Sequence, residues 1–203
     1  MNRNIAIFAS GRGTNFAAIV RAKRKGIIKA NLSLLVCDNP KAGVLSKAKR
    51  AGVKILLVER ENFPCKKDFE NQILQNLKKE KIDLIVLAGF MRILSPDFVR
   101  KYKERIINIH PALLPSFKGT EAIKDAFDYG VKVTGVTVHF VDEKMDHGPI
   151  ILQETVKIKE DDTLESLEEK IHKSEHRIYP QAIKLFLGGK LKITERKVKI
   201  SNQ

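Results

Sequence analysis

At residues 105–111 the chain has the sequence Arg-Ile-Ile-Asn-Ile-His-Pro, which predicts a buried β-strand that the proline ends. Because successive side chains along a strand point to opposite faces, Asn108 and His110 share one face while Ile107 and Ile109 pack behind them. Ligands of an open α/β sheet bind at the carboxyl ends of its strands. An amide and an imidazole at this position therefore predict a functional site, and a solvated strand end is the alternative.

Similar apolar runs precede this strand and alternate with amphipathic segments. We expect strands at Ile5–Ala9, Leu32–Cys37, Ile55–Val58, Leu84–Leu87 and Ile106–His110, with helices near 15–25, 42–51, 66–80 and 120–129. Such alternation is typical of an α/β fold in which right-handed crossovers connect parallel strands. The sequence therefore predicts a Rossmann-like, doubly wound, mostly parallel sheet.

The C-terminal half departs from this alternation. Two strand candidates, Thr134–Val141 and Ile150–Ile158, follow one another with only a polar loop between them, which predicts an antiparallel pair near the sheet edge. A long helix begins at Asp162 or Thr163, either of which can cap it, and ends at Gly188-Gly189. Because no linker, repeat or low-complexity segment interrupts the chain, we expect one domain over residues 1–203.

A glycine-rich turn, Ser-Gly-Arg-Gly-Thr-Asn at residues 10–15, joins the first strand to the first helix. Glycines allow the backbone to approach an anion, and a helix N-terminus supplies free N–H groups with a partial positive charge. The turn therefore favours phosphate binding, with a purely structural turn as the alternative. Phe16 stands where a dinucleotide fingerprint has its third glycine, whereas Asp38 after the second strand leaves a nicotinamide site open.

A polar loop at residues 142–149 separates the two late strands and contains Asp146 and His147. A carboxylate beside an imidazole favours the protonated imidazole, which is the form that a catalytic acid requires. Asp146 is therefore a candidate partner for His110, although the spacing alone does not bring the two together. An ordinary polar hairpin loop is the alternative.

Composition excludes several classes of protein. The chain has 203 residues, 43% of them hydrophobic, and no apolar run long enough to span a membrane. Its net charge of +14 is spread over most predicted helices, and without a cluster of aromatic and arginine residues we expect no nucleic-acid partner. Cys37 and Cys65 have neither disulfide nor metal-ligand spacing, which favours a reducing cytoplasm and no metal site.

Taken together, several motifs resemble the folate-dependent glycinamide ribonucleotide formyltransferase family of purine synthesis. The matching segments are residues 10–15, Leu-Ala-Gly-Phe-Met-Arg-Ile-Leu at 87–94, Asn-Ile-His-Pro at 108–111, Val-His-Phe-Val at 138–141, Asp146 with Gly148-Pro149, and Glu-His-Arg-Ile-Tyr-Pro at 175–180. They span the chain from Ile5 to about Gly189 in the family's order. The resemblance implies an enzyme that takes 10-formyltetrahydrofolate as co-substrate, holds no bound cofactor and works as a monomer or homodimer.

The resemblance also implies a role for each matching residue. Asn108, His110 and Asp146 would be catalytic, and Gly13, Thr14, Asn15 and Glu175 would bind the ribonucleotide. Folate would contact Lys66, Met91, Arg92, Ile93, Leu94 and Asn108. Independent support exists for Glu175, because it lies on the inward stripe of the last long helix, four residues after Ile171. A lysine or arginine partner for that carboxylate is the alternative.

Two other functions compete with this interpretation. A methionyl-tRNA formyltransferase shares the segment around Asn108 and His110, but we expect it to carry a further C-terminal domain for tRNA. A non-enzymatic nucleotide-binding module would use the turn at 10–15 and leave Asn108, His110 and Asp146 without a role.

Overall fold

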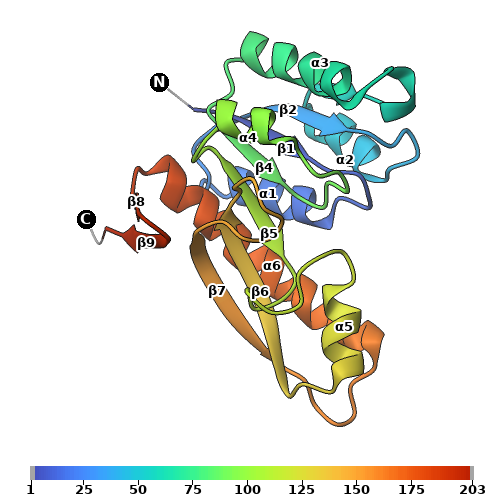
Figure 1. The fold of residues 1–203 in the computed structure, drawn as a ribbon, viewed down its shortest axis with the longest axis vertical. Helices are drawn as coiled ribbons and strands as arrows, with labels where there is room; N and C mark the ends of the chain where they lie inside the picture. Colours follow the sequence, from blue (N-terminus) through green and yellow to red (C-terminus); the bar gives the residue numbers. More distant parts are fainter. Residues whose placement is uncertain (1–2, 202–203) are drawn as a thin grey trace.

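Residues 3–201, which the computed structural model describes, form a nine-stranded sheet with helices on both faces (Figure 1). Its strands are β1 (Asn4–Phe8), β2 (Asn31–Cys37), β3 (Ile55–Leu57), β4 (Leu84–Leu87), β5 (Ile106–His110), β6 (Val133–Phe140), β7 (Ile150–Lys157), β8 (Leu191–Thr194) and β9 (Lys197–Ile200). They lie in the order β3-β2-β1-β4-β5-β6-β7-β9-β8. Strands β1 to β5 are parallel, and β6 is antiparallel to both β5 and β7, which confirms the predicted fold class.

The helices are α1 (Thr14–Arg24), α2 (Val44–Ala51), α3 (Lys66–Lys79), α4 (Pro96–Lys101), α5 (Ala122–Tyr129) and α6 (Leu164–Leu187), with a 3-10 turn at Arg60–Asn62. Side chains of β1 alternate between two hydrophobic cores, one on each face of the sheet. Ile5 and Ile7 pack with α1, α2 and α6, whereas Ala6 and Phe8 pack with α3 and α4. This arrangement is the doubly wound architecture that the sequence predicts.

The direction of winding reverses between β1 and β4, which are neighbours in the sheet although two strands separate them in sequence. The chain runs from β1 outward to β3 and then returns across the other face through α3 to β4. The loops that leave the carboxyl ends of β1 and β4 therefore diverge and leave room for a ligand between them.

Local signals explain where the elements begin and end. Thr163, one of the two expected caps, begins α6 in a capping box with Ser166, and Gly130 ends α5 in the left-handed conformation. Helix α4 and the hairpin β8–β9 are absent from our expectations. Ser95, whose hydroxyl accepts the Phe98 N–H at 3.2 Å, explains the start of α4 together with the proline that follows it.

Candidate active site

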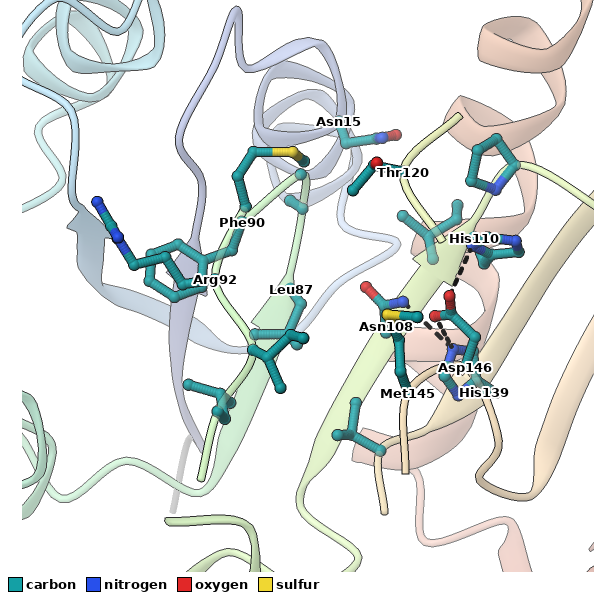
Figure 2. A pocket seen from close by; sticks show the side chains of 18 of the residues that line it. Asn15, Leu87, Phe90, Arg92, Asn108, His110, Thr120, His139, Met145 and Asp146 are labelled. Atoms are coloured by element: carbon teal, nitrogen blue, oxygen red, sulfur yellow. Dashed lines mark hydrogen bonds and ion pairs between the residues drawn. The ribbon is translucent and has the colours of Figure 1, made fainter. Parts of the chain in front are cut away.

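A cleft of about 560 Å³ opens at the carboxyl ends of β1, β4 and β5, next to the point where the winding reverses. It is lined by almost every site residue expected from the sequence, namely Gly13, Thr14, Asn15, Met91, Arg92, Ile93, Leu94, Asn108, His110, Asp146 and Glu175. Figure 2 shows the catalytic candidates gathered on one side of this cleft, with Phe90 and Arg92 on the other. Lys66 is the one expected residue that does not line it.

His110 is buried at the end of β5, and both of its ring nitrogens face acceptors. Its Nε2 lies 2.7 Å from the carbonyl oxygen of Phe117, so Nε2 carries a proton and donates it to that oxygen. Its Nδ1 lies 3.5 Å from Asp146 Oδ2, as the dashed line in Figure 2 marks. The predicted proximity of the imidazole and the carboxylate is present in the structure.

Asp146 is held in place by the backbone around it. Its Oδ2 accepts the N–H of Gly119 at 2.9 Å, and its own φ of 47° lies in the left-handed region, which aspartate tolerates better than most residues. The hairpin loop can fold back this closely because Gly148 lies against the Phe140 carbonyl, where a Cβ would come within 1.9 Å of that oxygen. The loop between β6 and β7 is therefore shaped to present Asp146 to His110.

His139 joins this cluster, although our sequence reasoning gave it no role. It lies directly opposite Asn108 across the β5–β6 pair, and its Nε2 is 3.2 Å from Asn108 Nδ2. Its Nδ1 is 2.8 Å from the Phe140 carbonyl and must donate to it, so Nε2 of the neutral ring accepts from Asn108. Burial lowers the pKa of His139 and favours this neutral form. Two signals were available in the sequence, namely its position in the alternating β6 segment and its place in the matching motif at 138–141.

The glycine-rich turn forms the opposite end of the cleft. Gly13 has a φ of 73° and packs so closely on Val44 that a Cβ would lie 2.6 Å from a Val44 methyl group. Asn15, in the first turn of α1, donates its Nδ2 hydrogen to Glu175 Oε2 at 3.0 Å. Phe16, which stands where a dinucleotide fingerprint has its third glycine, is fully buried in the core.

Glu175 is buried on α6 and contacts two polar side chains that line the same cleft. Besides Asn15, it accepts a hydrogen bond from His172, whose Nδ1 lies 2.9 Å from Oε2. This bond raises the pKa of His172 above its usual value. The partners of Glu175 are thus an asparagine and a histidine instead of the lysine or arginine considered from the sequence.

Residues 91–94 form an irregular wall of the cleft after β4. The side chains of Met91 and Ile93 are about two-thirds exposed, at 65% and 66%, and offer an apolar surface. Arg92 turns toward Asp38, and its Nε donates to Asp38 Oδ2 at 2.6 Å. Asp38 therefore has a protein partner and is not a free carboxylate for the ribose of a nicotinamide cofactor.

Two of the remaining charged residues lie outside the catalytic cluster. The ammonium group of Lys66 is half exposed and stands 4.0 Å from Glu70 in the same helix. His147, next to Asp146 in sequence, pairs with Asp142 at 2.6 Å and contacts Arg196 of the β8–β9 turn.

Within residues 3–201 no group of three or more metal-ligating side chains is arranged to hold a metal ion. In the same range no helix is long and apolar enough to cross a membrane.

Comparison with known proteins connects this site to one family. The formyl transferase family model matches residues 3–183. Phosphoribosylglycinamide formyltransferase of Bacillus subtilis is 46% identical over 186 residues, which cover 92% of this chain and 95% of that protein. This chain belongs to the phosphoribosylglycinamide formyltransferase family.

Solved structures of this family share the whole fold. Glycinamide ribonucleotide transformylase 1 of Symbiobacterium toebii superposes with a TM-score of 0.96 at 42% identity, over 99% of this chain and 95% of that one. The family also includes parts of larger proteins. The human trifunctional purine biosynthetic protein adenosine-3 is 40% identical over 94% of this chain, which spans only 19% of that protein.

Proposed function

We propose that this protein transfers the formyl group of 10-formyltetrahydrofolate to the amine of glycinamide ribonucleotide, a step of purine synthesis. The observation that carries the proposal is the cluster of Asn108, His110 and Asp146, which stands between a glycine-rich turn and an apolar wall. A turn of this kind suits the phosphate of one substrate, and an apolar wall suits the flat ring of the other. The cluster lies where their reacting atoms would meet.

The first step is attack of the neutral amine on the formyl carbon, which turns the formyl oxygen into an oxyanion. Asn108 has one Nδ2 hydrogen engaged by His139, which leaves the second free to donate to that oxygen. Protonated His110 stabilises the same oxygen through its charge. Of its two nitrogens, Nδ1 is the reactive one, because Nε2 is occupied by the Phe117 carbonyl.

The second step moves one proton from the amine to the departing folate nitrogen. Asp146 favours the protonated imidazole and accepts the amine proton directly or through a water molecule. His110 then delivers a proton from Nδ1 to N10 of the folate as the bond between the formyl carbon and N10 breaks. Asp146 returns the amine proton to Nδ1, which restores both groups to their starting state. The products are the formylated ribonucleotide and tetrahydrofolate, with no covalent enzyme intermediate.

The same proposal assigns the binding residues. Gly13, Thr14 and Asn15 bind the phosphate through backbone N–H groups, and Glu175 contacts the ribonucleotide. Residues 91–94 hold the pterin between apolar side chains and main-chain groups, while Lys66 interacts with the anionic tail of the folate beyond the cleft. We further propose a single cytoplasmic formyltransferase domain over residues 1–203, with small-molecule substrates and without nucleic-acid or membrane partners.

A coupled assay with both substrates tests the activity. Purified protein should produce formylglycinamide ribonucleotide, and His110→Ala or Asp146→Ala should reduce kcat by about 10² to 10³, the range for loss of a group that stabilises an oxyanion. Asp128→Ala is a control, because it removes a carboxylate that lies outside the cleft in a surface ion pair with Lys124. Wild-type kcat in Asp146→Ala would exclude the proposed role of that carboxylate.

A further inference from the structure

Two buried carboxylates, Asp38 and Glu70, lie behind the cleft and take no part in the reaction described above. Asp38 follows β2 and Glu70 lies in α3, and only 9% and 5% of their surfaces are exposed. Burying a carboxylate is costly unless hydrogen bonds compensate for the lost water. The hydrogen-bond partners of both carboxylates belong to one segment, residues 88–95, or reach it through a single side chain, and Glu70 also lies 4.0 Å from the half-exposed Lys66. We call this segment the wall loop.

Asp38 holds the middle of the wall loop. Its Oδ2 accepts from Arg92 Nε at 2.6 Å, and its Oδ1 accepts from the hydroxyl of Ser10 at 2.5 Å. Because that hydroxyl donates to Asp38, its oxygen is free to accept, and it does so from the N–H of Met91 at 2.9 Å. The carboxylate is thus joined to two consecutive residues of the wall loop, one directly and one through Ser10.

Glu70 holds the C-terminal end of the wall loop. Its Oε1 accepts the N–H of Ser95 at 2.7 Å, and its Oε2 accepts the hydroxyl of the same residue. The wall loop has no helix or strand of its own before α4, and backbone hydrogen bonds with the β1 segment hold its first two residues, Ala88 and Gly89. Beyond Gly89 its conformation depends on contacts with neighbouring side chains, and its middle and its end each meet one buried carboxylate.

We infer that Asp38 and Glu70 are positioning residues that hold the wall loop in the shape that binds folate. The inference rests on the proposed function, because it assigns the wall loop to the folate. Neither carboxylate lines the cleft, so neither touches the substrates or the reacting atoms. Loss of either carboxylate should therefore weaken folate binding and leave the rate of the chemical step unchanged.

Steady-state kinetics of Asp38→Asn and Glu70→Gln test this inference. Asparagine can still accept from Ser10, but its amide cannot replace the charge that faces Arg92. We expect the KM for 10-formyltetrahydrofolate to rise about tenfold, equivalent to about 1.4 kcal/mol, with kcat within about twofold of wild type. Glu70→Gln should change the folate KM in the same direction, and the ribonucleotide KM should stay constant in both variants.

Glu80→Gln is the matched control, because it removes one carboxylate from a surface ion pair with Lys54 at the far end of α3. Titration calorimetry with tetrahydrofolate gives binding without turnover, and thermal unfolding shows whether each variant is folded. An unchanged folate KM and Kd in both folded variants would overturn the inference while wild-type activity still supports the proposed function. A wild-type protein without formyl transfer would overturn the proposed function instead.

A double-mutant cycle with Arg92→Ala separates positioning from a general loss of stability. If Asp38 acts through Arg92, Asp38→Asn should raise the folate KM far less in the Arg92→Ala background than in wild type. If the free-energy changes calculated from the folate KM values are additive, Asp38 does not act through Arg92.

Discussion

At the residue scale, the direction of the Asn108 amide follows from one backbone carbonyl. The carbonyl oxygen of Phe140 accepts a hydrogen bond from Nδ1 of His139, which fixes the tautomer in which Nε2 carries no hydrogen. This Nε2 can only accept, so the NH2 group of Asn108 faces it instead of the amide oxygen. His139 therefore decides which group of Asn108 can reach the cleft.

Replacement of His139 tests this chain of contacts. His139→Leu removes the acceptor, so the Asn108 amide can rotate, and we expect kcat to fall by about tenfold or more while both KM values change little. His139→Gln offers an oxygen as a substitute acceptor and should recover part of kcat. Wild-type kcat in the folded leucine variant would contradict the role assigned to His139.

The ion pair between His172 and Glu175 predicts a pH-dependent contribution to stability. The hydrogen bond that His172 donates to Glu175 raises the pKa of His172 in the folded protein above its ordinary value of 6.5. Arg12 opposes this shift, and Glu168 supports it. A raised pKa in the folded state means that the stabilisation is complete below pH 6.5 and disappears as the pH rises through the folded pKa.

Urea unfolding of wild type and His172→Gln between pH 5.5 and 8.5 measures this contribution. We expect the difference in unfolding free energy to be largest at the acidic end and to shrink as the pH increases. A difference that stays constant across this range would show that the ion pair contributes no pH dependence.

At the scale of elements, α6 is attached to the central sheet by the buried hydroxyl of Tyr179. This hydroxyl donates to the carbonyl of Leu87 at 2.6 Å, and the Ile107 carbonyl lies 3.1 Å away. These carbonyls belong to β4 and β5, the two strands whose ends border the cleft. The same helix carries Glu175, so Tyr179 sets the position of Glu175 relative to His110.

Tyr179→Phe should therefore lower the free energy of unfolding by about 1–2 kcal/mol, because the buried Leu87 carbonyl loses its donor while the ring still fills its place. Tyr129→Phe is the control, since the Tyr129 side chain is 79% exposed and its replacement should have almost no effect. Denaturant unfolding of the two variants compares them directly. Equal stability of both variants would contradict the anchoring role of Tyr179.

At the scale of the whole molecule, the parts predicted from sequence are those that local patterns encode. The strands up to β5 are short apolar runs, and Asn108 and His110 are neighbours on a single strand. Helix α4 has only six residues, too few to show a helical period. The strands β8 and β9 are only partly buried, and lysines occupy three of their five exposed positions.

Parts of the site depend on contacts between distant segments, which no single stretch of sequence encodes. His139 meets Asn108 only because of the register between β5 and β6. Asp38 follows β2 and Arg92, 54 positions away, follows β4. The two meet because β2 and β4 lie on either side of β1 in the sheet. Residue types alone gave the candidates, whereas the sheet order determines which of them meet.

The packing of the sheet also predicts the reactivity of the two thiols. Cys37 is fully buried at the end of β2, where burial raises the pKa of its thiol, whereas Cys65 is exposed before α3. A thiol reagent such as dithionitrobenzoate should therefore modify about one equivalent rapidly in the native protein and about two after unfolding. Rapid modification of both thiols under native conditions would contradict this packing.

The two outer strands of the sheet bear on how the protein behaves at high concentration. An unpaired strand exposes N–H and C=O groups to which another polypeptide can add. Here one outer strand, β3, has only three residues, and the other, β8, carries an exposed lysine beside the lysines of β9. Both borders are thus poor templates for intermolecular strand addition, which protects a wide sheet against aggregation.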